Sequence, residues 1–136
     1  MEGFSPAADN NKGAILAVLA EWLPQQARLL EIGSGAGQHA IHMAGELKHI
    51  HWQPSDRASV LPMLTSNVAA YGSANILTPI KLDLAEDTWP AETFHCAYSA
   101  NVMHIVSSEL GEKLIRGAAK ALAEGGLLAL YGPYKY

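Results

Sequence analysis

The chain has little of what several classes of protein require. Its 136 residues include one cysteine, Cys96, which rules out an internal disulfide framework and a cysteine-based zinc site. A lone cysteine in an apolar run fits a small, buried hydrophobic position. No apolar run reaches about 18 residues, and the N-terminus has no basic-then-apolar secretion signal. We therefore expect a cytoplasmic protein with no membrane partner.

Basic residues are also few. Nine Lys and Arg face thirteen Asp and Glu, for a formal net charge of −4. A nucleic-acid surface needs clustered Lys and Arg, so we expect no nucleic-acid partner. A hydrophobic content of 49% with 16% charged residues is typical of a folded globular chain. The length predicts a single domain over residues 1–136.

What the chain does have is a glycine-rich turn. Gly33, Gly35 and Gly37 follow the short apolar run 29–32 and precede helix-compatible residues. A strand that turns through glycines into a helix places backbone N–H groups and the helix N-terminus beside the strand's carboxyl end. Such a turn holds a nucleotide-like ligand. The alternative is a glycine-rich turn that binds nothing.

The spacing of these glycines separates two ligand classes. Dinucleotide folds require G-x-G-x-x-G, and the positions where the last glycine would fall hold Gln38 and Ala40. The observed pattern is E-x-G-x-G-x-G, with Glu31 as its acid. This pattern resembles motif I of class I S-adenosylmethionine (SAM) dependent methyltransferases. The resemblance implies that Glu31 lies near the methionyl amine of SAM.

Two further acids lie near expected strand ends. Asp56 follows the glycines by about 20 residues, where an acid accepts hydrogen bonds from ribose hydroxyls. A surface Asp in a Pro-Ser-Asp turn is the alternative. Asp83 ends the third expected strand. In SAM enzymes an acid at that place reaches the adenine amino group, although a turn-capping Asp fits Asp83 equally well.

Apolar spacing predicts alternating strands and helices. The expected strands cover residues 28–32, 49–53, 76–82, 94–99 and 127–131. The expected helices are one before Pro24 built on Ile15, Leu19, Trp22 and Leu23, one over 38–47, one over 59–71, and one from 107 or 108 to Gly125-Gly126. This alternation predicts an α/β fold with a mostly parallel sheet flanked by helices. The expected strand order is 3-2-1-4-5.

The six histidines suggest a metal site at first sight. His39 and His42 lie three residues apart, and His49 and His51 share a strand face. No carboxylate or cysteine completes either pair in a pattern typical of a metal site. We therefore expect no metal.

Longer sequence patterns extend the glycine motif. They are S-P-A-x-E-R-N-K near residues 5–12, L-E-I-x-S-G-x-G-Q-H-A at 30–40, W-Q-P-S-D at 52–56, S-A-N-x-x-H-I at 99–105 and L-Y-G-P-[FY] at 130–134. The first pattern departs at Asp9 and Asn10, where Glu and Arg are usual. With these patterns the chain resembles a little-characterised family of class I methyltransferase-like proteins, and it is similar to that family over nearly its whole length.

The resemblance implies a Rossmann-like class I methyltransferase fold with SAM as cofactor and a small-molecule acceptor. The cofactor-binding residues it implies are Glu31, Gly33, Gly35, Gly37, Asp56 and Asp83. Asn101 and His104, just past strand four, lie where class I enzymes place groups near the transferred methyl. His104 could act as a general base if the acceptor carries a proton, and a packing histidine is the alternative.

Family chains are longer, with a further helix and two more strands. Without those strands, the fifth strand becomes an edge, and edge strands recruit other chains. A homodimer through that edge is therefore an expectation. Two other functions remain open, namely a non-catalytic interaction module with a SAM-binding fold and an NAD- or nucleotide-binding enzyme.

Overall fold

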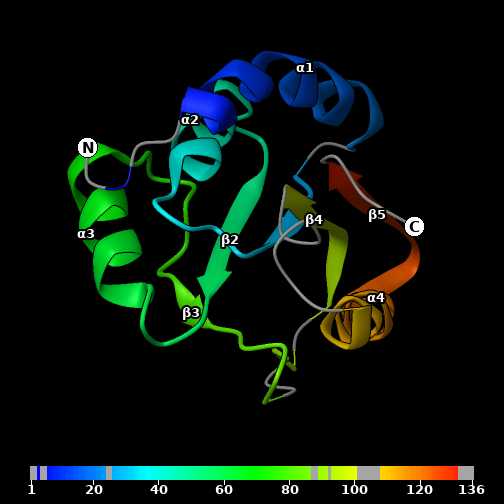
Figure 1. The fold of residues 1–136 in the computed structure, drawn as a ribbon. Coiled ribbons are helices and arrows are strands. Elements are labelled where there is room, and N and C mark those ends of the chain that lie inside the picture. Colours follow the sequence, from blue (N-terminus) through cyan, green and yellow to red (C-terminus); the bar gives the residue numbers. More distant parts are fainter. Residues whose placement is uncertain are drawn as a thin grey trace.

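A five-stranded parallel sheet forms the centre of the protein (Figure 1). The computed structural model describes residue 3 and residues 6–23, 26–86, 89–91, 93–100 and 108–131. Its strands are β1 (Arg28–Ile32), β2 (His51–Asp56), β3 (Ile80–Lys81), β4 (Phe94–Ala100) and β5 (Leu122–Tyr131). Its helices are α1 (Pro6–Trp22), α2 (Gln38–Glu46), α3 (Leu61–Tyr71) and α4 (Ser108–Ala121). The strand order β3-β2-β1-β4-β5 confirms the predicted one.

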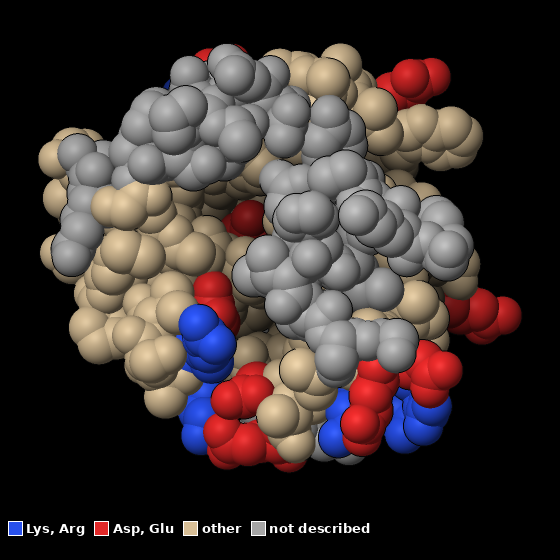
Figure 2. Space-filling model, viewed as in Figure 1, with Lys and Arg blue, Asp and Glu red and all other residues tan. Residues whose placement is uncertain are grey.

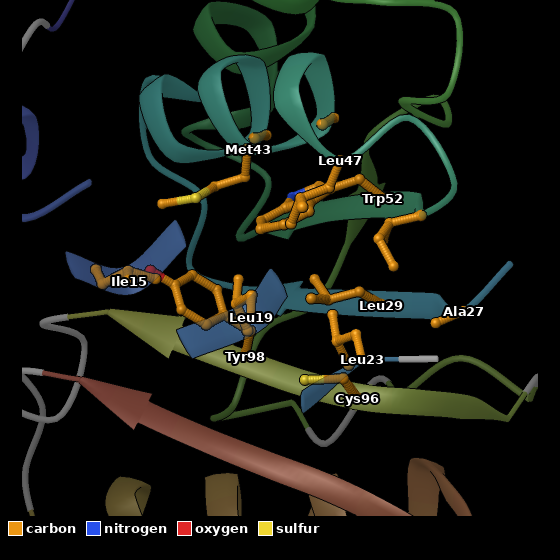
Figure 3. Close-up of a cluster of buried hydrophobic side chains, with 13 residues drawn as sticks. Ile15, Leu19, Leu23, Ala27, Leu29, Met43, Leu47, Trp52, Cys96 and Tyr98 are labelled. Atoms are coloured by element: carbon orange, nitrogen blue, oxygen red, sulfur yellow. The ribbon is translucent and has the colours of Figure 1, made fainter. Parts of the chain in front are cut away.

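Helices cover both faces of this sheet, so two separate cores form. Side chains alternate along a strand, and β1 sends Leu29 to one face and Leu30 to the other. The first face packs against α1 and α2, with Leu19 and Met43 among its members (Figure 3). The second face packs against α4, where Leu114 is fully buried. Burial on both faces explains why β1 is a short and mostly apolar run, whereas β2 also buries the polar Gln53 and Ser55.

The boundary between β2 and β3 differs from the expected one. Strand β2 runs on through Pro54 to Asp56 rather than ending at Gln53, and β3 keeps only Ile80–Lys81 of the expected 76–82. Proline has no N–H to donate, so regular pairing on the β3 side is interrupted. The Gln53 side-chain amide bridges the gap by donating to the Pro54 and Thr78 carbonyls, at 2.9 Å each.

Strand β5 begins earlier than expected. It starts at Leu122, and α4 ends at Ala121 rather than at Gly125-Gly126. Phe94 pairs with Leu122 and Cys96 pairs with Leu127, so β5 bulges between these two pairs. Gly125 lies in the bulge with a φ of 78°, a backbone conformation that glycine adopts readily. The two glycines therefore form a bulge within the strand instead of ending the helix.

The first helix buries only part of its expected apolar stripe. Ile15, Leu19 and Leu23 are buried as predicted, whereas the Trp22 side chain is 65% exposed. Helix α3 begins at Leu61 rather than at residue 59, with proline in its first turn. No helix in the described ranges is long and apolar enough to cross a bilayer.

Candidate functional site

The turn between β1 and α2 contains three positions whose backbone conformation only glycine adopts easily. Gly33, Gly35 and Gly37 have φ angles of 73°, 58° and 87°, in the left-handed region that strains other residues. A Cβ added to Gly35 would meet no atom within 4 Å. That side of the loop is open, so a ligand can approach the backbone closely there.

The Asp56 side chain holds the tip of this loop. The Gly35 N–H donates to Asp56 Oδ2 at 2.8 Å, and the Arg57 N–H donates to Oδ1 at 2.8 Å. A carboxylate has about four acceptor positions, so two N–H donors leave capacity for ligand hydroxyls. Asp56 thus connects the end of β2 to the glycine loop.

Neighbouring polar groups fix the rest of the loop. The Ser34 N–H donates to the Ser55 carbonyl at 2.9 Å, and the Ser55 N–H donates to Ser34 Oγ at 3.0 Å. From α3, Asn67 Nδ2 donates to the Ala36 carbonyl at 2.9 Å. Sequence reasoning assigned no role to these residues. Ser34 belongs to the S-G-x-G pattern and Ser55 to the W-Q-P-S-D pattern, so their place in these patterns could have indicated a role.

The acid of the glycine motif is buried behind the loop. Glu31 is 3% exposed and accepts a hydrogen bond from Trp52 Nε1 at 3.1 Å. Burial raises the pKa of the Glu31 carboxyl, and the nearby Asp56 charge adds to that rise. His39 and hydrogen bonds from Trp52 and Ser34 act in the opposite direction. Glu31 is therefore an acid whose ionised form needs a nearby positive charge.

His39, in the first turn of α2, is a buried residue that the sequence analysis considered only as a metal ligand. Its Nδ1 lies 3.0 Å from the Tyr98 hydroxyl of β4. Within the described residues no group of three or more His, Cys, Asp or Glu side chains could hold a metal ion. The place of His39 in the Q-H-A pattern, next to the glycine loop, could have indicated that it lies near the candidate site.

Asp83 lies two residues beyond the end of β3 and makes a local turn. Its Oδ1 accepts the Ala85 N–H at 3.0 Å, and its carbonyl accepts the Glu86 N–H at 3.1 Å. This geometry matches the turn-capping alternative and leaves a ligand role as a prediction. Asn101 and His104 lie outside the described residues, directly after β4. The end of β4 is tied to that of β1, because Ser99 Oγ donates to the Ile32 carbonyl at 3.0 Å.

The ends of the sheet differ in shape and polarity. Figure 2 shows the surface hollowed near β2, beside the β1–α2 loop, with an acidic side chain at the bottom of the hollow. A second cavity, of about 100 Å³, lies at the amino end of β4 and is lined in part by Trp22, His95 and Leu127. Its lining includes Glu124, Gly125 and Gly126 of β5, but neither the β1–α2 glycines nor an acid at the carboxyl end of a strand. The β1–α2 end is therefore the candidate site.

Cys96 fits the position predicted for it. Its side chain is fully buried in the core between β4 and the α1–α2 layer. Burial raises the pKa of the Cys96 thiol to about 12. A thiol that resists ionisation is a poor nucleophile, so Cys96 acts as a packing residue.

The chain belongs to the family described as "Protein of unknown function (DUF938)", which matches residues 2–136. Its fold is the Rossmann-like fold of SAM-dependent methyltransferases. It is similar to the SAM-dependent methyltransferase SibL in its apo form, with a TM-score of 0.78 and 22% identity over 90% of this chain and 36% of that one.

Two further similar structures contain small molecules. Coclaurine N-methyltransferase bound to N-methylheliamine and S-adenosylhomocysteine (SAH) has a TM-score of 0.70 and 19% identity, over 96% of this chain and 38% of that one. An O-methyltransferase family 2 protein from Planctomyces limnophilus in complex with apigenin has a TM-score of 0.68 and 20% identity. That match covers 90% of this chain and 40% of the other. The chain thus spans well under half the length of these three structures.

Proposed function

We propose that this DUF938 member is a SAM-dependent methyltransferase that acts on a small molecule. The observation that carries the proposal is the junction of the glycine loop with Asp56. The loop turns through three left-handed glycines, is open at Gly35, and anchors the Asp56 carboxylate through the Gly35 N–H. A nucleoside ligand needs this combination of close backbone approach and an acid for its ribose.

The residues around the loop fit the parts of SAM. Glu31 supplies negative charge for the amino group of the methionine part, and its burial strengthens that attraction. The open backbone at Gly35 allows close approach, and we propose that Gly33 and Gly37, on either side of it, complete the binding loop. Asp56 retains acceptor capacity for ribose hydroxyls. For Asp83 we propose a contact with the adenine, which would leave its turn with Ala85 in place.

When bound, SAM supplies a methyl group on a positively charged sulfur, which is already activated for transfer. The protein must then align an acceptor with that methyl. We propose Asn101 and His104 for this task, since the chain enters that segment from the carboxyl end of β4. His104 would take a proton from the acceptor if the acceptor carries one.

The proposal of a small-molecule acceptor rests on two of the similar structures. Coclaurine N-methyltransferase has N-methylheliamine bound, and the Planctomyces limnophilus protein has apigenin bound. Both ligands are small molecules. The acceptor of this chain belongs to the same broad class in our proposal, with its identity open.

Calorimetry with SAH tests the cofactor part of the proposal. Wild-type protein should bind SAH in preference to NADH. Asp56→Ala removes an acceptor of ligand hydrogen bonds and frees the loop N–H that it holds. We expect SAH affinity to fall roughly ten- to a hundredfold, or about 1.5–3 kcal/mol.

Glu112→Ala is the matched control for Asp56→Ala. It also removes a carboxylate, but Glu112 lies on α4 with its side chain 74% exposed. Its SAH affinity should equal that of the wild type. Equal affinity in Asp56→Ala as well would remove Asp56 from the site, and preferential binding of NADH would favour the nucleotide enzyme.

A methyl-transfer screen on candidate acceptors tests for turnover. Once an acceptor is found, His104→Ala should lower the rate about 10²–10⁴-fold while SAH affinity stays unchanged. A normal rate would reduce His104 to a packing residue. SAH binding without turnover on any acceptor, including by longer family members, would favour the non-catalytic interaction module.

We also propose that β5 can recruit a second copy of the chain. It pairs with β4 on one side and is the last strand in the sheet order. Strand edges with unpaired N–H and C=O groups bind other strands. Light scattering at tens of micromolar should then show a dimer, and a monomer with a cooperative melt would count against this association.

A further inference from the structure

Trp52, in β2, is fully buried, and its one polar side-chain atom contacts the candidate site from behind. The indole packs in the core of the α1–α2 face, in the same cluster as Leu29 and Met43 (Figure 3). Its Nε1–H donates to Glu31 Oε1 at 3.1 Å. A buried tryptophan N–H usually finds a hydrogen-bond partner. Here that partner is the acid of the glycine motif.

The register of the sheet explains how the indole reaches Glu31. Trp52 pairs with Leu29 of β1, and Glu31 lies two residues further along the same strand. Side chains two residues apart on a strand project to the same face. Leu29 and Glu31 therefore share the face on which the indole packs. The Trp52 side chain runs along that face toward the carboxyl end of β1, where the glycine loop begins.

Both the backbone and the ring of Trp52 are held in place. Its N–H donates to the Asn75 carbonyl at 3.0 Å, and its carbonyl accepts the Leu77 N–H at 2.8 Å. The indole meets the Tyr98 ring edge-on, with 5.7 Å between the ring centroids. A side chain locked by packing keeps its polar group in a fixed geometry. Trp52 is therefore a rigid donor to Glu31.

This hydrogen bond acts on the charge of Glu31 as well as on its position. Burial raises the pKa of the Glu31 carboxyl, whereas the hydrogen bond from Trp52 lowers that pKa. A fixed N–H donor favours the ionised form of a carboxylate and sets the direction in which the carboxylate faces. Both effects suit a carboxylate that binds a cation.

We propose that Trp52 is a positioning residue, which orients the Glu31 carboxylate toward the ammonium group of SAM. The inference rests on the proposed function, because it assigns a supporting residue to the same site. Trp52 is fully buried, so it acts through Glu31 and not by touching the ligand. Loss of the indole N–H should therefore weaken binding of ligands that carry the ammonium group and spare adenosine ligands that lack it.

Calorimetry with two ligands tests this role in Trp52→Phe, which keeps an aromatic ring and removes the N–H. SAH carries the ammonium group, whereas methylthioadenosine has the same adenosine and sulfur without the amino-acid part. Trp52→Phe should bind SAH about tenfold more weakly than the wild type, as expected for one lost hydrogen bond to a charged group. Its affinity for methylthioadenosine should be unchanged. Equal losses for both ligands, or an unchanged SAH affinity, would overturn the inference.

Trp89→Phe is the matched control for Trp52→Phe. Trp89 packs on the α4 face of the sheet, and its buried Nε1 has no hydrogen-bond partner among the described residues. The same substitution there should leave SAH affinity at the wild-type value. In Glu31→Gln, which lacks the charge, adding Trp52→Phe should lower SAH affinity by little more. A further loss of about tenfold in that double variant would show that Trp52 does not act through Glu31.

NMR of the ligand-free wild type needs no variant to fold. The Trp52 Nε1–H resonance should shift with the same midpoint pH as the Glu31 carboxyl carbon, because the two groups share a hydrogen bond. In Trp52→Phe the carboxyl titration should move to higher pH. Asp56, His39 and Tyr98, which also lie near Glu31, are the same in both proteins.

The possible failures are distinguishable. A Trp52 resonance that does not follow the Glu31 titration would overturn the inference and leave SAH binding untouched. A wild type that binds no SAH would refute the proposed function, and the role of Trp52 with it.

Discussion

The two faces of the central sheet are both buried, but they differ in the chemistry of what they bury. On the α4 face, β1 places Leu30 and Ile32 against helix residues such as Leu114 and Ala118. On the α1–α2 face, the same strand places Leu29 and then Glu31. One strand thus contributes to an apolar core on one side and to a group of buried ionisable side chains on the other.

Polar side chains on the α4 face are of a simpler kind. Ser55 Oγ donates to the Glu31 carbonyl and Ser99 Oγ donates to the Ile32 carbonyl, so both hydroxyls satisfy backbone groups of β1. The ionisable side chains that are buried within the described ranges, Glu31, His39, Cys96 and Tyr98, all belong to the other face. We infer that the α4 face mainly stabilises the fold and that the α1–α2 face, at its carboxyl end, carries function.

The largest expected effect comes from opening a cavity in the α4 face. Leu114 is fully buried, so Leu114→Ala should lower the free energy of unfolding by about 2–5 kcal/mol. The affinity of the remaining folded protein for SAH should not change, because Leu114 lies across the sheet from the glycine loop. Urea denaturation and calorimetry measure the two quantities. A large loss of affinity without loss of stability would contradict the division between faces.

The opposite pattern is expected for Glu31→Gln. The amide keeps an oxygen to accept the Trp52 N–H but loses the charge, so SAH affinity should fall by roughly ten- to a hundredfold. The stability of Glu31→Gln should be higher than that of the wild type at neutral pH, since burial disfavours a charged carboxylate and the amide has no charge. Calorimetry and thermal melting at pH 7.5 check both results.

The pH dependence of stability sharpens the Glu31 prediction. Folding raises the pKa of Glu31, so the folded state favours its protonated form. That stabilisation is fully present below the ordinary value of 4.5 and is lost as pH rises through the raised value. Relative to Glu31→Gln, the wild type should therefore lose stability as pH rises above 4.5. A constant difference in melting temperature would show that Glu31 is not perturbed by folding.

A smaller loss is expected for Gly117→Ala in α4. Helix propensity alone predicts a gain of about 1 kcal/mol from this change. A Cβ on Gly117, however, would overlap the indole ring of Trp89. Overpacking of this kind costs about 1–3 kcal/mol, so urea denaturation should show a net destabilisation. A more stable variant would show that Trp89 can move aside.

The smallest effect is expected for the matched change in α2, Gly45→Ala. A Cβ on Gly45 would meet no atom within 4 Å, so helix propensity should decide the outcome. We expect a gain in stability of up to about 1 kcal/mol with unchanged SAH affinity. A loss in the same urea experiment would mean that the α1–α2 layer is packed more tightly than its structure indicates.

Local signals predicted much of this fold. The bounds of β1 were right, because an apolar run ending in glycines defines both ends of a strand. The β2–β3 region was wrong, because Pro54 was expected to end a strand that it in fact continues. Its missing donor is replaced by the Gln53 side chain. Such a side-chain bridge depends on the segment before β3 that contains Thr78, and sequence spacing does not reveal where that segment lies.

The candidate site was predictable only where it is local or tied to a strand end. Glu31, the glycines and Asp56 lie together because the carboxyl ends of parallel strands meet at the same end of the sheet. The contact between His39 and Tyr98 joins residues 59 positions apart and depends on how α2 packs on β4. Asn101, His104 and the ligand role of Asp83 stay predictions.

The most direct test of the central claim, that SAM binds at the β1–α2 loop, is an amide NMR titration of the 136-residue chain with SAH. We expect saturable shifts at Gly33, Gly35 and Gly37, with a further shift at Arg57, whose N–H donates to Asp56. Gly125, in the bulge at the opposite end of the sheet, should not move. Shifts confined to that opposite end, or no shifts at millimolar SAH, would contradict the account.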